Sequence, residues 1–145
     1  MQKQHPLPDT GPSGHDSVLP VPGEPIPLTA DIVFKYIFGH RNSTGILRSL
    51  LSAIQTDAGF PAITQVLIEN PFNLQDFTNH KLSIVDVRAV DVNGTMFTVE
   101  VQATQEAAFI KRALYYWAAT YHRQLGTGVP YTELQPTVGV NILDY

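Results

Sequence analysis

Two acidic residues on neighbouring β-rich runs have a spacing that could support metal chemistry. In the first run, residues 82–91, Asp86 alternates with apolar residues, and in the second, residues 95–102, Glu100 does the same. Such alternation gives each strand one apolar face and one polar face. Two carboxylates held close together repel each other unless a proton or a cation lies between them. If Asp86 and Glu100 converge, they form a candidate site for a divalent cation.

Their convergence depends on the turn between the two runs. Directly opposed residues on antiparallel strands point to the same side of the sheet, so the polar faces coincide only when paired residue numbers have an even sum. A two-residue turn, 93–94, would pair Val92 with Thr95 and set Asp86 and Glu100 on opposite faces. The hydrophobic pattern is incompatible with that turn.

A three-residue loop, 92–94, is compatible with the pattern. With Gly94 left-handed in a bulge, Asp86 lies directly across from Glu100. A one-residue shift of this loop would pair Asp86 with Gln102 instead, and the carboxylates would still share a face. We therefore expect Asp86, Glu100 and Gln102 to converge.

The residues leave two interpretations of this acidic pair open. Hard oxygen ligands suit Mg²⁺, and also Mn²⁺ or Ca²⁺. Alternatively, Asp86 and Glu100 lie on a solvated sheet face, paired with Arg88, because acidic pairs on exposed hairpins are common. Spacing alone does not decide between them.

Composition limits the function classes. The chain has 145 residues, 43% of them hydrophobic, which suffices for one domain with a real core. The lack of cysteine excludes disulfide frameworks, thiolate metal sites and a thiol nucleophile. With no apolar run long enough to cross a membrane and no export signal, we expect a soluble cytoplasmic protein. The formal net charge of −4 argues against tight non-specific DNA binding but not against a nuclease, since an ion partly neutralises the carboxylates around it.

The remaining sequence predicts an α/β domain behind a disordered leader. Residues 1–27 hold seven of the eleven prolines and few large apolar side chains. Beyond them we expect two N-terminal helices on one face of the core, a mixed sheet of about four strands, and a long helix before the last strand. Thr29 is the expected cap of the first helix, and Asn42 or Ser43 that of the second. The expected bounds are 28–39 and 43–54 for these helices, 63–69, 82–91 and 95–102 for three strands, 105–125 for the long helix, and 137–143 for the last strand.

Five segments in a fixed order resemble a known family, the PD-(D/E)XK nuclease family transposases, also called the Rpn recombination-promoting nucleases. The resemblance spans about residues 28–145. The segments are 31–39 (DIVFKYIFG), 81–89 (KLSIVDVRA), Asn93-Gly94 before 99–102 (VEVQ), 111–117 (KRALYYW) and 124–131 (QLGTGVPY).

The resemblance implies a restriction-endonuclease-like core and a metal site. Asp86 and Glu100 would be metal ligands, the Val101 carbonyl would complete the inner shell, and Gln102 would take the position usually held by lysine. Asp86, Glu100 and Gln102 are thus the expected catalytic residues. A neutral amide can only donate hydrogen bonds to a developing charge, so the ion would supply most of the water activation and charge neutralisation.

Two further residues are candidates for accessory roles. Asp31 could approach the site as an additional acid, although a carboxylate near the start of a helix also favours the helix dipole. Arg112 could contact a phosphate through its planar fork, or it could be a surface arginine. The helical spacing of the aromatic residues on the long helix favours packing in the core; these are Tyr115, Tyr116, Trp117 and Tyr121.

Together these features predict a Mg²⁺-dependent endonuclease that hydrolyses DNA phosphodiester bonds, functions in DNA recombination and can form a homodimer. A rival expectation is a catalytically inactive relative, truncated after the last strand at Tyr145 or degenerate at Gln102, that acts as a binding or assembly module. A third is a fold that a metal stabilises without catalysis.

Overall fold

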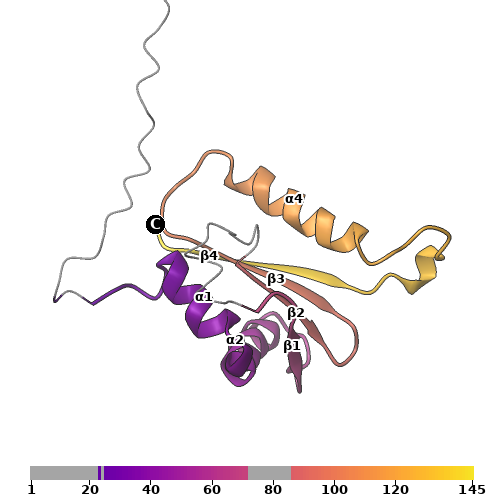
Figure 1. The fold of residues 1–145 in the computed structure, drawn as a ribbon, viewed down its shortest axis with the longest axis horizontal. Coiled ribbons are helices and arrows are strands. Elements are labelled where there is room, and N and C mark those ends of the chain that lie inside the picture. Colours follow the sequence, from indigo (N-terminus) through magenta and orange to yellow (C-terminus); the bar gives the residue numbers. More distant parts are fainter. Residues whose placement is uncertain (1–22, 24, 72–85) are drawn as a thin grey trace, which may run out of the picture.

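A computed structural model of the protein describes residues 23, 25–71 and 86–145 (Figure 1). The α/β class, with two N-terminal helices and a further helix before the last strand, is confirmed. Most of the expected leader, residues 1–22 and 24, lies outside the described residues. The elements are α1 (Asp31–Gly39), the 3₁₀ helix η1 (Arg41–Ser43), α2 (Thr44–Asp57), β1 (Val66–Ile68), β2 (Val87–Asp91), β3 (Met96–Gln102), α4 (Phe109–His122), the 3₁₀ helix η2 (Tyr131–Glu133) and β4 (Thr137–Leu143).

The two N-terminal helices each bury one apolar face. Phe34 and Phe38 lie one turn apart on α1, and Leu47 and Leu51 do so on α2. Residues at i and i+4 share a helix face, so each pair points into the same core. This core also contains the apolar side chains of the sheet, which fixes α1 and α2 on one side of it.

The sheet has the strand order β1-β2-β3-β4, with the first two pairs antiparallel and the third parallel. Val87 pairs with Val99, and Ala89 pairs with Phe97, so four buried residues share the face that α1 and α2 cover. The ladder ends at Val87, and the same register extended by one residue would set Asp86 across from Glu100. The even-sum register expected from the alternation is therefore confirmed.

The loop between β2 and β3 fixes this register. Asp91 N donates to Thr95 O at 3.0 Å, so residues 92–94 form the expected three-residue loop. Asp91 Oδ1 also accepts from the backbone N–H groups of Asn93 (2.8 Å) and Thr95 (2.9 Å). Gly94 has a φ of 83°, the left-handed conformation that glycine adopts without strain.

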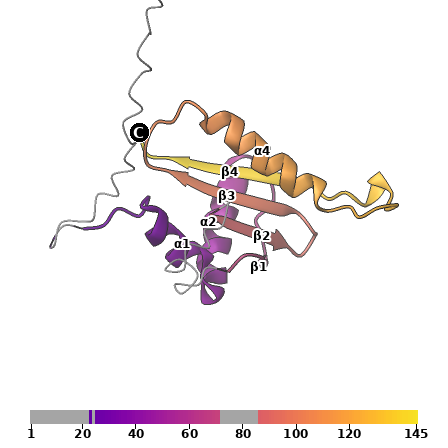
Figure 2. The ribbon, with the colours of Figure 1, turned by 45° about the horizontal axis from the view of Figure 1, so that its top comes forward.

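Helix α4 covers the other face of the sheet, above β3 and β4 (Figure 2). Parallel neighbours need a crossover connection, and α4 lies within the one that joins β3 to β4. Trp117 Nε1 on α4 donates to Thr137 O at 2.8 Å, which attaches the helix to the beginning of β4. The polar face of the sheet is consequently covered by a helix.

Several expected boundaries and contacts are wrong. Thr29 does not cap α1, whose cap position is Ala30; its hydroxyl instead donates to Asp144 Oδ2 at 2.6 Å. Ser43 does occupy the expected cap position of α2, but its side chain makes no capping hydrogen bond. Helix α4 is shorter than expected, and its Tyr115 is 68% exposed, because one sheet face covers only one stripe of a helix.

Other expectations are only partly tested. Residues 82–85 of the expected second strand lie outside the described residues, and β1 is shorter than expected. Among the helices of the described ranges, none has the length and apolarity needed to cross a membrane.

Candidate active site

Asp86 lies immediately before β2, and the fold engages both of its carboxylate oxygens. Oδ2 accepts a hydrogen bond from Val101 N at 2.8 Å, and Oδ1 lies 3.2 Å from Nζ of Lys35. Burial raises the pKa of Asp86, the Val101 N–H group and the Lys35 charge oppose this rise, and Asp31 adds to it. The partner of Asp86 is therefore a buried ammonium, where the solvated-face interpretation expected Arg88.

Lys35 reaches this site from α1. Its side chain is only 8% exposed, and Nζ also lies 2.8 Å from Oδ1 of Asp31, one helical turn earlier. Burial alone would lower the pKa of Lys35, but the hydrogen bonds and charges of Asp31 and Asp86 outweigh it, and the pKa lies above its ordinary value. Asp31 thus belongs to the site through Lys35, as the partner of a charged lysine.

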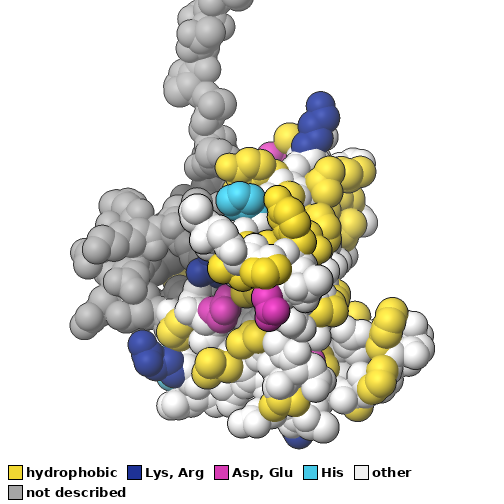
Figure 3. Space-filling model, turned by 90° about the vertical axis from the view of Figure 1, so that its right-hand side faces the viewer, with side chains coloured by type: hydrophobic (Ala, Val, Ile, Leu, Met, Phe, Trp, Pro, Cys, Tyr) yellow, Lys and Arg dark blue, Asp and Glu magenta, His cyan; other side chains and the backbone are white. Residues whose placement is uncertain are grey.

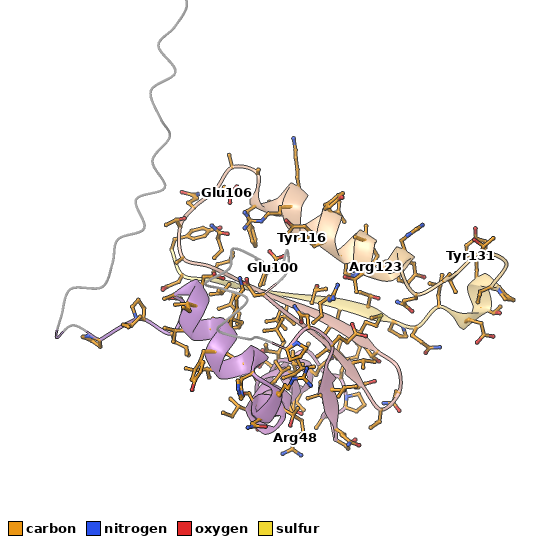
Figure 4. The ribbon with its side chains drawn as sticks, viewed as in Figure 1. Arg48, Glu100, Glu106, Tyr116, Arg123 and Tyr131 are labelled. Carbon is orange, nitrogen blue, oxygen red and sulfur yellow. The ribbon has the colours of Figure 1, made fainter. Side chains whose placement is uncertain are left out.

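Glu100, on β3, is 7% exposed and lies on the side of the sheet that α4 covers (Figure 4). Burial, followed by the nearby charge of Asp86, raises the pKa of Glu100 to about 7, although Arg112 and Lys35 act in the other direction. Its Oε1 atom is buried and has no hydrogen-bond partner among the described residues. The interpretation that this acidic pair lies on a solvated face is therefore wrong.

Arg112, on the first half of α4, connects Glu100 with the loop that follows β3. Its Nε lies 3.9 Å from Glu100 Oε2, while its two terminal nitrogens donate to Glu106 Oε2 and Gln102 Oε1, each at 2.5 Å. Gln102 Nε2 donates to Thr104 O at 2.7 Å. Gln102 is therefore near the acidic pair, but its amide is directed to Arg112 and Thr104.

These residues could hold a cation with few protein ligands. In the described part of the chain, no group of three or more acidic or histidine side chains has a geometry suited to a metal ion. The side-chain ligands available at this corner of the sheet are Asp86 and Glu100, and backbone oxygens would have to supplement them. The unpaired oxygen of Glu100 and the mutual repulsion of the carboxylates fit a divalent cation.

Two cavities help to locate the site. Glu100 lines a cavity of about 210 Å³ between α4 and the sheet, together with Thr98, Trp117 and Asn141. A larger cavity of about 630 Å³ is lined largely by apolar residues, including Leu51, Phe97 and Val140, on the opposite face of the sheet. The larger cavity is therefore separate from the acidic pair.

Lys35 is a site residue that the sequence pattern does not reveal, although it lies within the segment 31–39 that carries the family resemblance. One signal was available, because Lys35 lies four residues after Asp31 and beside Phe34, on the apolar face of its helix. A lysine on the apolar face of a helix is stable only if its ammonium group pairs with a buried anion or extends past the core into solvent.

Comparison with known proteins gives one match. No curated protein and no solved structure matches the chain. A family model described as PD-(D/E)XK nuclease family transposase matches residues 28–145, which include every helix and strand described above. The three helices and four-stranded mixed sheet of the described residues are consistent with a restriction-endonuclease-like fold. This chain belongs to the family of PD-(D/E)XK nuclease transposases.

Proposed function

We propose that this protein is a metal-dependent endonuclease that hydrolyses DNA phosphodiester bonds, with Asp86 and Glu100 as its metal ligands. Membership of a nuclease family supports the general activity. The observation that carries the specific proposal is the buried Oε1 of Glu100, which has no partner in the described structure although it lies beside a second carboxylate. A buried anion in that position is costly unless a cation or a proton accompanies it.

The Val101 carbonyl is the proposed third ligand. In a β-strand, the N–H and C=O groups of one residue point to the same side of the strand. Val101 N–H donates to Asp86 Oδ2, so its carbonyl is directed to the same side of β3 as Asp86. Two carboxylates, one carbonyl and water would suit Mg²⁺ or Mn²⁺, and Ca²⁺ could occupy the site without supporting the reaction.

Lys35 is proposed to provide the positive charge that Gln102 lacks. When bound, a divalent cation would lower the pKa of an attacking water and neutralise charge on the phosphate. Lys35 Nζ lies 3.2 Å from Asp86 Oδ1, so the ammonium orients that carboxylate and can donate to a phosphate oxygen. Gln102 has the supporting role of holding Arg112, whose guanidinium can contact a neighbouring phosphate.

A plasmid-nicking assay with Mg²⁺ or Mn²⁺ tests this proposal. The isosteric variants Asp86→Asn and Glu100→Gln should each lose at least 100-fold in rate, the scale typical of removing one charge-stabilising group from an active site. The control Glu133→Gln removes an exposed carboxylate from η2 and should retain the wild-type rate. Equal nicking by all four proteins would refute the assignment and indicate another source of activity.

A second candidate function is a binding or assembly module without catalysis. The amide at position 102 favours it, because Arg112 and Thr104 already engage the side chain. Calorimetric titration with Mg²⁺ would then detect binding while the nicking assay detected no cleavage. A cytoplasmic location, a role in DNA recombination and a homodimer remain predictions from the sequence.

A further inference from the structure

A second polar cavity lies on the same face of the sheet as Glu100. It has a volume of about 190 Å³ and is lined by Glu69, Arg88, Met96, Thr120, Arg123 and Gln124. Arg88 pairs with Thr98, which lies two residues before Glu100 on β3, so the side chains of Arg88 and Glu100 lie on the same face. Met96, which also lines the cavity, lies four residues before Glu100 on β3, and four residues along a strand correspond to about 13 Å, so the cavity and the proposed metal site lie within roughly 7–13 Å of each other.

Two buried polar atoms at this cavity have no hydrogen-bond partner among the residues that the structure describes. They are Nε of Arg88 and Oγ1 of Thr120, a residue that is 2% exposed. Buried polar groups are almost always paired, because an unpaired one has lost its hydrogen bonds to water without replacement. Both residues line the same cavity, so a guanidinium N–H and a hydroxyl without partners lie at its wall, and they are candidate donors for a ligand that accepts hydrogen bonds.

The charges around the cavity favour an anion with a single negative charge. Burial, followed by the nearby charge of Arg123, lowers the pKa of Arg88, and the charge of Glu69 acts in the opposite direction. Arg123 lies at the end of α4, on the stretch of helix away from Glu106 (Figure 4). Two guanidinium groups and one carboxylate leave one positive charge. A phosphodiester carries one negative charge, so it matches this balance.

Gln124 takes no part in this binding, because its side chain already has partners. Its Nε2 donates to Thr137 Oγ1 at 2.8 Å, and its Oε1 accepts from Gln135 N at 2.8 Å. These bonds fix the end of α4 over the sheet and so hold Thr120 and Arg123 at the cavity. The ligand-binding atoms are therefore those of Arg88, Thr120 and Arg123.

We propose that this cavity is a subsite for a phosphate of the DNA strand, on the same face of the sheet as Glu100 and a short distance along the strand from the phosphate that is cleaved. Arg88 Nε–H and Thr120 Oγ1–H donate to its oxygens, and Arg123 provides the second positive charge. This inference rests on the proposed nuclease function. On the face shown in Figure 3, the basic side chains are dispersed and form no stripe, so this face offers discrete phosphate contacts and no continuous basic track.

The first test is nuclear magnetic resonance of the arginine Nε–H groups in the metal-free Asp86→Asn variant, with dimethyl phosphate as the diester probe. The Arg88 signal should shift in a saturable way, and it should not do so when Arg123→Gln is added. Arg48→Gln is the matched control, because it removes an arginine from α2 on the other side of the sheet. No saturable shift, or an equal shift with Arg123→Gln, overturns the proposal. Stronger binding of inorganic phosphate than of the diester would reassign the cavity to a free phosphate ion and overturn the DNA subsite.

The second test is binding of a short DNA duplex by fluorescence anisotropy in the same Asp86→Asn background. Arg123→Gln should weaken binding about tenfold and reduce the slope of log K against log salt by about 0.9, the value for one lost phosphate contact. Equal effects of Arg123→Gln and Arg48→Gln would overturn the subsite. Neither test requires cleavage, so the two proposals can fail separately. If the binding tests are positive but the plasmid is not nicked, the nuclease function alone is refuted. If the plasmid is nicked but the Arg88 signal does not shift, the subsite alone is refuted.

Discussion

Replacing Glu100 by glutamine should stabilise the metal-free protein, and the gain should depend on pH. Burial and the neighbouring Asp86 raise the pKa of Glu100 to about 7, compared with an ordinary value of 4.5. The folded state therefore keeps a proton on Glu100 that the unfolded state releases. Stability is lost as the pH rises from about 4.5 to about 7, and the loss is complete above that range.

The size of the effect follows from this difference. One pH unit between the folded and unfolded pKa corresponds to about 1.4 kcal/mol, so ionised Glu100 destabilises the fold by about 3 kcal/mol at pH 8. At pH 5 the destabilisation of the fold by Glu100 is only about 1 kcal/mol, because at this pH Glu100 of the unfolded chain is only partly ionised. Glu100→Gln removes the charge and keeps the shape, so the variant should be more stable by these amounts.

Urea unfolding in the presence of EDTA at the two pH values measures this difference. At pH 8 the midpoint of Glu100→Gln should lie about 1–3 M above that of the wild type, for the urea m-values of small domains. The control Glu133→Gln, which changes an exposed residue of η2, should unfold with the wild-type protein at both pH values.

Two outcomes would refute the reasoning. If Glu100→Gln were less stable than the wild type at pH 8, the ionised carboxylate would have a stabilising partner, whereas Oε1 of Glu100 has none among the described residues. If the gain were equal at pH 5 and pH 8, it would arise from packing and not from ionisation. Adding Mg²⁺ at pH 8 should stabilise the wild type and leave the variant unchanged, because only the wild type retains both proposed ligands.

Four further predictions follow from the same structure. Mg²⁺ affinity, measured by calorimetry, should fall about tenfold between pH 8 and pH 6, and binding near pH 7 should release protons, because Glu100 must be ionised to bind the ion. Lys35→Met should lower the free energy of unfolding by about 2–3 kcal/mol in urea titrations, since it leaves a buried carboxylate unpaired. Gly94→Ala should lower the free energy of unfolding by about 1–3 kcal/mol, because Gly94 has a positive φ and a new Cβ would lie only 3.1 Å from Gln135 Cγ. Gly45→Ala on α2 is the contrasting case: a new Cβ there meets open space, so the free energy of unfolding should rise by about 0.5–1 kcal/mol. Leu47→Ala should lower it by about 2–5 kcal/mol, because the side chain is fully buried.

The register of the hairpin could be predicted from the sequence because only an even-sum register puts the apolar residues of both strands on one face. A slip of one residue would expose Phe97 or bury Arg88, so the alternation itself selects the pairing. Gly94 then selects the three-residue loop, since its left-handed conformation suits the bulge. The expected bounds of β4, residues 137–143, are also those of the structure.

Lys35 could not be assigned a role from the same kind of pattern. A lysine on a helix usually extends to solvent, and whether it meets Asp86 depends on how α1 packs against a strand that begins 52 positions later in the chain. Local periodicity contains no information on that packing. The expected end of α4 differs from the structure for a related reason: residues 123–125 are acceptable in a helix by propensity, but the chain turns there toward β4.

The position of α4 explains why the sequence suggested a solvated acidic pair and the structure gives a buried one. Alternation predicts which side chains share a face, but it does not predict what covers that face. On the hairpin alone, water would surround Glu100, and its pKa would stay near the ordinary value. The crossover from β3 to β4 places α4 over the polar residues, which removes water from Glu100 and also encloses Arg88 and Thr120. One topological feature therefore buries a carboxylate oxygen and two donor groups that have no hydrogen-bond partner among the residues that the structure describes. The first fits a metal ion and the second a phosphate, and both ligands are those that a nuclease of DNA would bring together.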